Sequence, residues 1–123
     1  MKASELIALA DELVENPFSD AVKIHLINSI ERRIHVEVLL EQPTDVQSVT
    51  ADNLENYELT LDGRDELYLA WMRTMYYWNM AEREEYQNEK EMFDSCWEDL
   101  CHDVAEREHQ GSCGKEYTYA FES

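Results

Sequence analysis

The stretch "YYWNMAEREEYQNEKEMF", from Tyr76 to Phe93, decides how the C-terminal half of this chain folds. It passes from bulky aromatic residues into a block of charge and back to aromatic residues without a Gly or a Pro. Helix is expected throughout, because nothing in the run strongly disfavours it. Asn88 with Glu91 three residues on resembles a capping pair, which favours a break near Asn88. A single long helix from Asp65 to Glu108 is the alternative.

Apolar side chains recur at helical spacing on both sides of this stretch. The helix that begins near Asp65 carries an apolar band too broad for packing against a single surface. We therefore expect this helix to pack against two different surfaces. The helix that follows should bury a second set of side chains. The two sets are Leu67, Tyr68, Trp71, Met72, Met75, Tyr76 and Trp78, and Met92, Phe93, Cys96, Trp97, Leu100 and Val104.

Two shorter amphipathic helices are expected in the N-terminal half. Ser4 is the expected cap of the first, and Asn16-Pro17 should end it. Ser19 should open the second, which ends before Pro43. The expected buried positions are Leu6, Leu9, Ala10 and Leu13 in the first helix and Val22, Leu26, Ile27, Ile30, Ile34 and Val38 in the second. In the second helix these apolar residues form one stripe, and Lys23, Glu31 and Arg32 are expected to lie away from it.

Residues 42–64 lack helical periodicity and form a long loop, a feature uncommon in compact domains. Within it, alternation over residues 57–61 predicts a short strand before the turn at Asp62-Gly63. Alternation of Tyr117, Tyr119 and Phe121 marks a second candidate strand, and the two could pair within one chain or between chains. The predicted fold is therefore mainly α: about four helices in a domain over residues 1–109, a long loop with a short strand or hairpin, and a tail over residues 110–123 that is strand-forming or flexible.

Composition limits the classes of function. With 123 residues and 44% hydrophobic composition, the chain should form one small domain. Ten Lys and Arg against 28 Asp and Glu give a formal charge of −18, which disfavours binding to nucleic acids and anionic membranes. The N-terminus lacks the pattern of a signal peptide, no apolar run is long enough to span a bilayer, and three cysteines do not close a disulfide framework. An intracellular, reduced, soluble protein is expected.

Residues that could carry chemistry do not form a recognisable site. Zinc-ligand types occur near the C-terminus at Cys96, Cys101, His102, His109 and Cys113, but their spacing is poor and no C-x-x-C pair is present. Buried small cysteines and solvated histidines explain them better. Carboxylate pairs are so abundant that a solvated face is the simpler interpretation. Glycine-rich phosphate loops and hydrolase motifs are absent from the sequence. We expect no metal, no cofactor and no enzyme activity.

The order of parts resembles that of small head-tail connector proteins of tailed bacteriophages and prophages, also called adaptor or head completion proteins. The resemblance covers about Ser4 to Arg107. It is carried by "FSDAVKIHLINSIERRI", by "DELYLAWM" and by the run "YQNEKEMF" from Tyr86 to Phe93. The chain departs from the family in its high acidity, in Asp62-Gly63-Arg64 where a Pro-containing turn is expected, and in the tail after Gln110.

The resemblance implies a mainly helical, non-enzymatic subunit that assembles as a ring of about a dozen copies. Such a ring lies beneath the portal protein, continues the DNA channel without specific DNA binding, and docks the tail-completion or stopper protein. The expected location is the neck of the virion, and the host cytoplasm during assembly.

Two sets of residues are candidates for these contacts. Exposed alternation and excess apolar width predict assembly contacts at Tyr57, Leu59, Leu61, Tyr68, Trp71, Tyr76 and Trp78. An acidic face toward the lumen or a partner is predicted at Glu84, Glu85, Glu89, Asp94 and Glu98. The competing class is an acidic inhibitor that mimics DNA and binds a basic host protein. Its discriminating feature is a continuous outer face of carboxylates.

Overall fold

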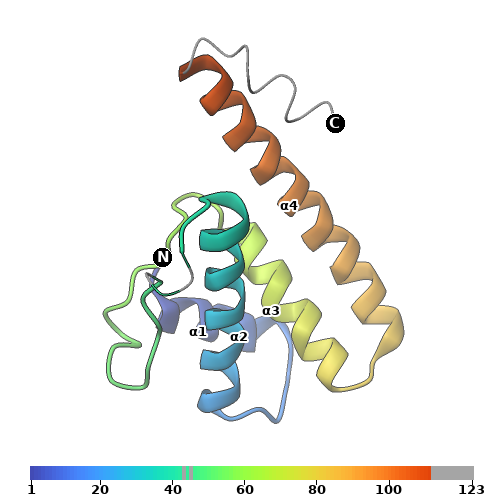
Figure 1. Cartoon of the computed structure of the whole chain (residues 1–123). Helices are drawn as coiled ribbons and strands as arrows, with labels where there is room; N and C mark the ends of the chain where they lie inside the picture. The colour runs from blue at the N-terminus through green and yellow to red at the C-terminus, as the bar shows by residue number, and fades with distance from the viewer. Residues whose placement is uncertain (43, 45, 112–123) are drawn as a thin grey trace.

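The computed structural model describes residues 1–42, 44 and 46–111, with side chains as far as residue 107. These residues form four α-helices: α1 (Ala3–Leu13), α2 (Asp20–Arg33), α3 (Asp65–Asn79) and α4 (Arg83–Gly111) (Figure 1). A π-helical turn, η1 (Ile34–Val38), continues α2. The prediction of a mainly helical chain with about four helices is confirmed. Within the described residues, no helix combines the length and the apolar character needed to cross a membrane.

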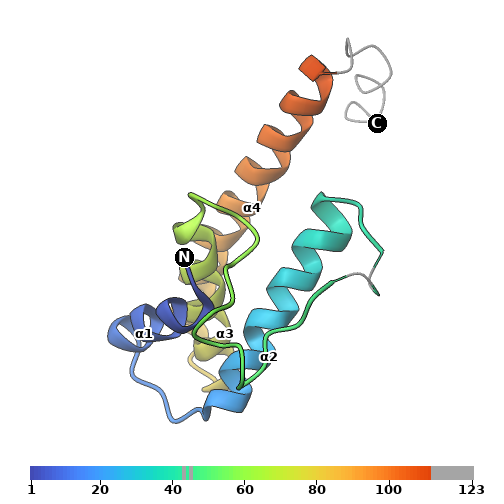
Figure 2. The same cartoon turned by 90° about the vertical axis from the view of Figure 1, so that its left-hand side faces the viewer.

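Helix α3 is the centre of the fold, because it contacts each of the other three α-helices. It forms an antiparallel hairpin with α4, while α1 and α2 pack against its other sides (Figures 1 and 2). The broad apolar band predicted for this helix is explained by these several contacts. The core that they enclose includes Leu6, Ile27, Ile30, Tyr68 and Met72, none of which has measurable exposure.

The chain breaks between α3 and α4 at Met80–Glu82, so both predictions for this region were wrong: neither a break near Asn88 nor one continuous helix. Ala81 adopts the left-handed conformation with φ 59°. The N–H of Ala81 donates to the carbonyl of Trp78 (3.1 Å), and that of Glu82 to Tyr77 (3.0 Å). This is a Schellman cap, in which glycine is the usual left-handed residue. Because alanine takes its place, the sequence gives no sign of the turn.

The two N-terminal helices follow the prediction only in part. Ser19 caps α2 as expected, its Oγ accepting from Val22 N at 3.4 Å. Helix α1 instead begins at Ala3 with Lys2 as its N-cap, so the assignment of Ser4 as cap was wrong. Three positions expected to be buried are exposed: Leu9, Leu13 and Val22. Helix α1 is oriented about its axis so that Ile7, rather than Leu9, faces the core.

Two charged residues expected on the outer face of α2 are buried, Lys23 at 7% and Glu31 at 1% exposure. Lys23 Nζ lies 2.8 Å from Asp11 Oδ2 of α1, and this ion pair compensates the burial. The exposure of Arg32, by contrast, agrees with the prediction.

The segment before α3 folds back along the start of the chain without forming a strand in the described residues. Its one bridge pairs Lys2 with Glu58, and Leu59 N donates to Met1 O at 2.9 Å. The predicted strand at residues 57–61 is therefore wrong, since a single bridge does not propagate into a ladder. Asn28 of α2 holds the loop at Val49 through two hydrogen bonds, of 2.9 and 2.7 Å. The second predicted strand, in the tail, lies outside the described residues.

Candidate functional site

Three of the seven residues predicted as assembly contacts lie inside the subunit. Leu59, Tyr68 and Tyr76 are buried, at 6%, 0% and 0% exposure. Tyr76 packs on Phe18 with ring centroids 5.5 Å apart and donates from its hydroxyl to Asp11 Oδ1 at 3.0 Å. In a single chain these three side chains offer no surface to a second copy. They belong to the core.

Three further predicted contacts are half-buried and have partners within the chain. Trp71 donates from Nε1 to the carbonyl of Leu26 at 2.9 Å and packs on Phe93, with centroids 5.3 Å apart. The hydroxyl of Tyr57 donates to Glu31 at 3.0 Å. Leu61 packs at the edge of the core. Their exposed edges remain accessible, but their main contacts are internal.

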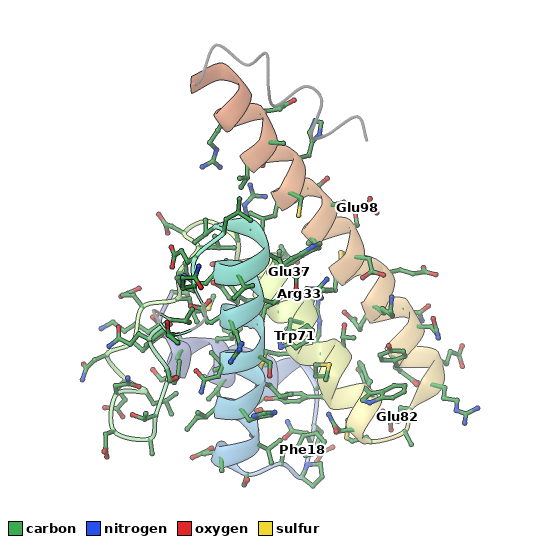
Figure 3. All side chains as sticks on the ribbon, viewed as in Figure 1. Phe18, Arg33, Glu37, Trp71, Glu82 and Glu98 are labelled. Carbon is green, nitrogen blue, oxygen red and sulfur yellow. The ribbon has the colours of Figure 1, made fainter. Side chains whose placement is uncertain are left out.

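Trp78 is the exception, because 59% of its surface is exposed. It stands in the last turn of α3, where its ring lies 4.9 Å from that of Tyr86 of α4 at an angle of 47°. Beside this pair, the α3–α4 turn encloses a hollow of about 630 Å³, here called the turn hollow. Its lining residues are Tyr77, Trp78, Asn79, Ala81, Glu82, Arg83, Tyr86 and Gln87. Figure 3 shows Glu82 at this turn.

The five predicted acidic residues divide into paired and exposed groups. Glu89 lies 3.0 Å from Arg73 Nε of α3, although the two atoms are not aligned as a hydrogen bond. Asp94 accepts from Lys90 Nζ at 2.7 Å, one helical turn earlier. Glu84, Glu85 and Glu98 are exposed and form no ion pair with any part of the chain that the structure describes. Only these three therefore fit the predicted acidic face; Glu98 is labelled beside α4 in Figure 3.

A buried carboxylate that the sequence interpretation missed organises the other side of the molecule. Glu31 accepts hydrogen bonds from the hydroxyls of Tyr57 and Tyr68 and from both the N–H and the hydroxyl of Thr60. Three of these donors meet Oε2 and one meets Oε1, so both oxygens of the carboxylate accept hydrogen bonds. Burial is the main cause that raises the pKa values of Tyr57 and Tyr68 well above the ordinary tyrosine value, and the nearby Glu31 charge raises them further. Both phenols therefore stay protonated.

Spacing along α2 could have indicated this site. Glu31 follows Ile27 by four residues and precedes Ile34 by three, so the helical period places it on the buried stripe. A charged residue at such a position needs hydrogen-bonding partners. The nearby tyrosines and threonine of the loop and α3 supply them.

Beside this cluster, a hydroxyl, an imidazole and a carboxylate lie in the order found in hydrolase triads. His35 Nε2 lies 2.8 Å from Thr60 Oγ1, and His35 Nδ1 lies 2.7 Å from Glu41 Oε2. The Thr60 hydroxyl, however, gives its single proton to the Glu31 carboxylate at 2.5 Å and so accepts from His35. An imidazole that donates to the hydroxyl cannot remove its proton. This arrangement fastens the loop to η1 and supports no nucleophilic step.

The cysteines and histidines do not converge. No group of three or more His, Cys, Asp and Glu placed to hold a metal occurs in the part of the chain that the structure describes. Burial raises the pKa of Cys96, which disfavours the thiolate that metals bind, whereas Cys101 is exposed. His102 lies 3.0 Å from Glu106 one turn later. The side chain of His109 and all of Cys113 lie outside the described residues.

Comparisons with protein-family models, with curated proteins and with solved structures each found no match for this chain.

Proposed function

We propose that this chain is a structural subunit of the head-tail connector of a tailed bacteriophage or prophage. In this role, copies of the chain form a ring between the portal protein and a tail-completion or stopper protein, and the ring continues the DNA channel. The motifs that carry the resemblance to connector proteins lie on α2, α3 and α4, which make up most of the fold. The proposal assigns no reaction to the chain.

The observation that carries the proposal is the shape of α4. Helix α4 packs against the core through Phe93 and Leu100, which are 3% and 2% exposed, and Val104 packs at the edge of the core. The helix then continues to Gly111, and its C-terminal part projects beyond the other helices (Figures 1 and 2). The last described side chains of the helix, Glu106 and Arg107, are exposed. A helical segment with little tertiary packing is only marginally stable in water. A neighbouring copy in a ring would supply that packing.

A projecting helix end that packs on a different surface of the next copy makes a heterologous contact, and such contacts close into rings when the rotation allows it. The exposed carboxylates of Glu84, Glu85 and Glu98 could then face a hydrated channel. A negatively charged wall would let DNA pass without binding it, because binding to phosphates requires Lys and Arg.

The test is the solution mass by light scattering across a range of salt concentrations, with negative-stain images of any large species. Salt should promote assembly by screening the repulsion among copies that each carry a charge of −18. A ring with a central hole is the expected result. Monomers or dimers at every salt concentration would count against self-assembly.

One observation favours a second candidate, an acidic inhibitor of a basic host protein. Glu84, Glu91 and Glu98 are exposed and seven residues apart, so they lie on one face of α4 at intervals of about 10 Å. A row of carboxylates on one outer face is the feature that this class requires. Tight, salt-sensitive binding of a monomer to a basic nucleic-acid-binding protein would support this candidate over the connector.

A further inference from the structure

We infer that the turn hollow binds a cationic side chain, an arginine or a lysine, presented by a basic segment of a different protein. The inference concerns the walls of this hollow and does not depend on ring formation.

The first support is the aromatic lining. Tyr77, Trp78 and Tyr86 come from two helices that meet at the turn, and all three line the hollow. Trp78 is tilted against Tyr86 and leaves more than half of its surface accessible. Faces of Trp and Tyr attract cations through the ring quadrupole, with Trp the strongest of the aromatic residues.

The second support is charge. Glu82 lines the hollow, and Glu84 and Glu85 follow it on the exposed first turn of α4. Burial raises the pKa of the Tyr77 hydroxyl, and the carboxylates of Glu89, Glu82 and Glu85 raise it further. Several negative charges therefore act on one wall of the hollow. Arg83 also lines the hollow and opposes them with one positive charge. Since Arg73 compensates Glu89, the two carboxylates of Glu82 and Glu85 outweigh Arg83.

The chain already uses the proposed chemistry elsewhere. The guanidinium of Arg33, on α2, lies over the ring of Trp97 at 4.2 Å and over that of Phe93 at 5.5 Å. This internal contact joins α2 to α4 and shows how an arginine fits against the aromatic side chains of this fold. The turn hollow offers comparable ring faces at the surface.

A different protein is the better source of the cation than a second copy. Five of the described Lys and Arg residues are already ion-paired with carboxylates of the same chain: Lys23, Arg33, Arg64, Arg73 and Lys90. A second copy would also bring its own charge of −18 toward an acidic surface. A basic segment of another protein meets that surface with favourable charge, which also speeds association at low salt.

The test uses the full chain labelled with 5-fluorotryptophan. The three tryptophans of the chain should give separate 19F resonances. Loss of one resonance in Trp78→Phe assigns Trp78. The probe is the peptide acetyl-Gly-Arg-Gly-amide, and the matched control replaces arginine with citrulline, which has nearly the same shape but no charge. The arginine peptide should shift the Trp78 resonance saturably and leave those of Trp71 and Trp97 in place. The citrulline peptide should not shift it.

Variants of the rim refine the test. Replacing both Glu82 and Glu85 with Gln should weaken binding of the arginine peptide by about two- to fivefold, the scale of exposed charge interactions. Arg83→Ala should strengthen it, and Glu12→Gln, an exposed position on α1, should leave it unchanged. Equal shifts with the two peptides, or an unmoved Trp78 resonance, would overturn the inference. Because the readout is a peptide bound to one subunit, it fails or succeeds separately from ring formation.

Discussion

The hydroxyl of Tyr68 on α3 donates a hydrogen bond to the Glu31 carboxylate on α2, across 37 residues of sequence. The same carboxylate accepts from Tyr57 and Thr60 of the intervening loop, so one buried charge joins two helices and the connection between them. These donors lie 26 to 37 residues after Glu31 in the sequence, and the shared acceptor holds the loop in place.

Replacing Glu31 with alanine should therefore destabilise the fold strongly. Three side chains would lose their hydrogen-bond acceptor in a buried site. Each unsatisfied group costs about 1–3 kcal/mol, and any water that enters and replaces the acceptor reduces this cost. We expect a loss of about 3 kcal/mol in the free energy of unfolding, measured by urea denaturation. The exposed neighbour Arg32→Ala is the matched control and should change stability by less than about 0.5 kcal/mol. Equal effects of the two substitutions would contradict the role assigned to Glu31.

The Asp11 carboxylate should make stability depend on pH. Its partial burial acts to raise its pKa, but hydrogen bonds from Lys23, Asn16 and Tyr76 outweigh this and hold the pKa below the usual 3.8. A lowered pKa adds stability that is complete above the usual value and is lost as the pH falls through the folded-state value. Asp11→Asn should cost about 1–2 kcal/mol at neutral pH, a modest amount because solvent screens a side chain that is 36% exposed.

Urea unfolding of wild type and Asp11→Asn from about pH 7 to about pH 3 checks this. The difference between the two proteins should shrink on the acid side, once Asp11 of the wild type takes up its proton. Glu12→Gln, on the adjacent exposed position of α1, is the control and should show a small, pH-independent difference. A constant gap for Asp11→Asn would show that its charge is not what matters.

Phe93 should be the main attachment of α4 to the body. It is 3% exposed, packs on Trp71 and Trp97, and lies beneath Arg33. Phe93→Ala should reduce the free energy of unfolding by about 3–5 kcal/mol. Met92, the preceding residue, is 48% exposed, and Met92→Ala should cost less than about 1 kcal/mol. Similar losses for the two variants would mean that α4 does not pack as described.

Ala81 offers a test of the α3–α4 turn. Its φ of 59° is strained for alanine and unstrained for glycine, so Ala81→Gly should stabilise the protein by about 0.5–1 kcal/mol, which is the strain relieved less the greater entropy that glycine loses on folding. Ala81→Val should destabilise it by more than about 1 kcal/mol, because a β-branched side chain tolerates this conformation poorly. Thermal unfolding of the three proteins gives the order, and a valine variant as stable as the glycine variant would rule out the left-handed turn.

The sequence was informative where local chemistry decides the structure. Helical periodicity located the helices, and Ser19 marked the start of α2, because a side-chain cap depends on a few neighbouring residues. The end of α3 was not predictable, since its left-handed residue is Ala81 rather than glycine. The burial of Glu31 required knowing that Tyr57, Thr60 and Tyr68 would converge on it, which is a tertiary fact.

The candidate site was predicted less well, for a physical reason. Apolar periodicity shows that a side chain is removed from water, but not whether its own chain or a neighbouring molecule covers it. Tyr68 and Tyr76 are covered by their own chain, whereas Trp78, from the same helical band, stays exposed at the turn. The sequence also did not show which of its many carboxylates are ion-paired. Glu89 and Asp94 have cationic partners, whereas Glu98 has none among the described residues.

Native mass spectrometry of the full chain after assembly at increasing salt tests most directly whether the chain forms a ring, as we propose. The expected result is one large species with a fixed number of subunits, independent of protein concentration once formed, as a closed ring requires. Monomers and dimers alone, or an open series of sizes that grows with concentration, would contradict it.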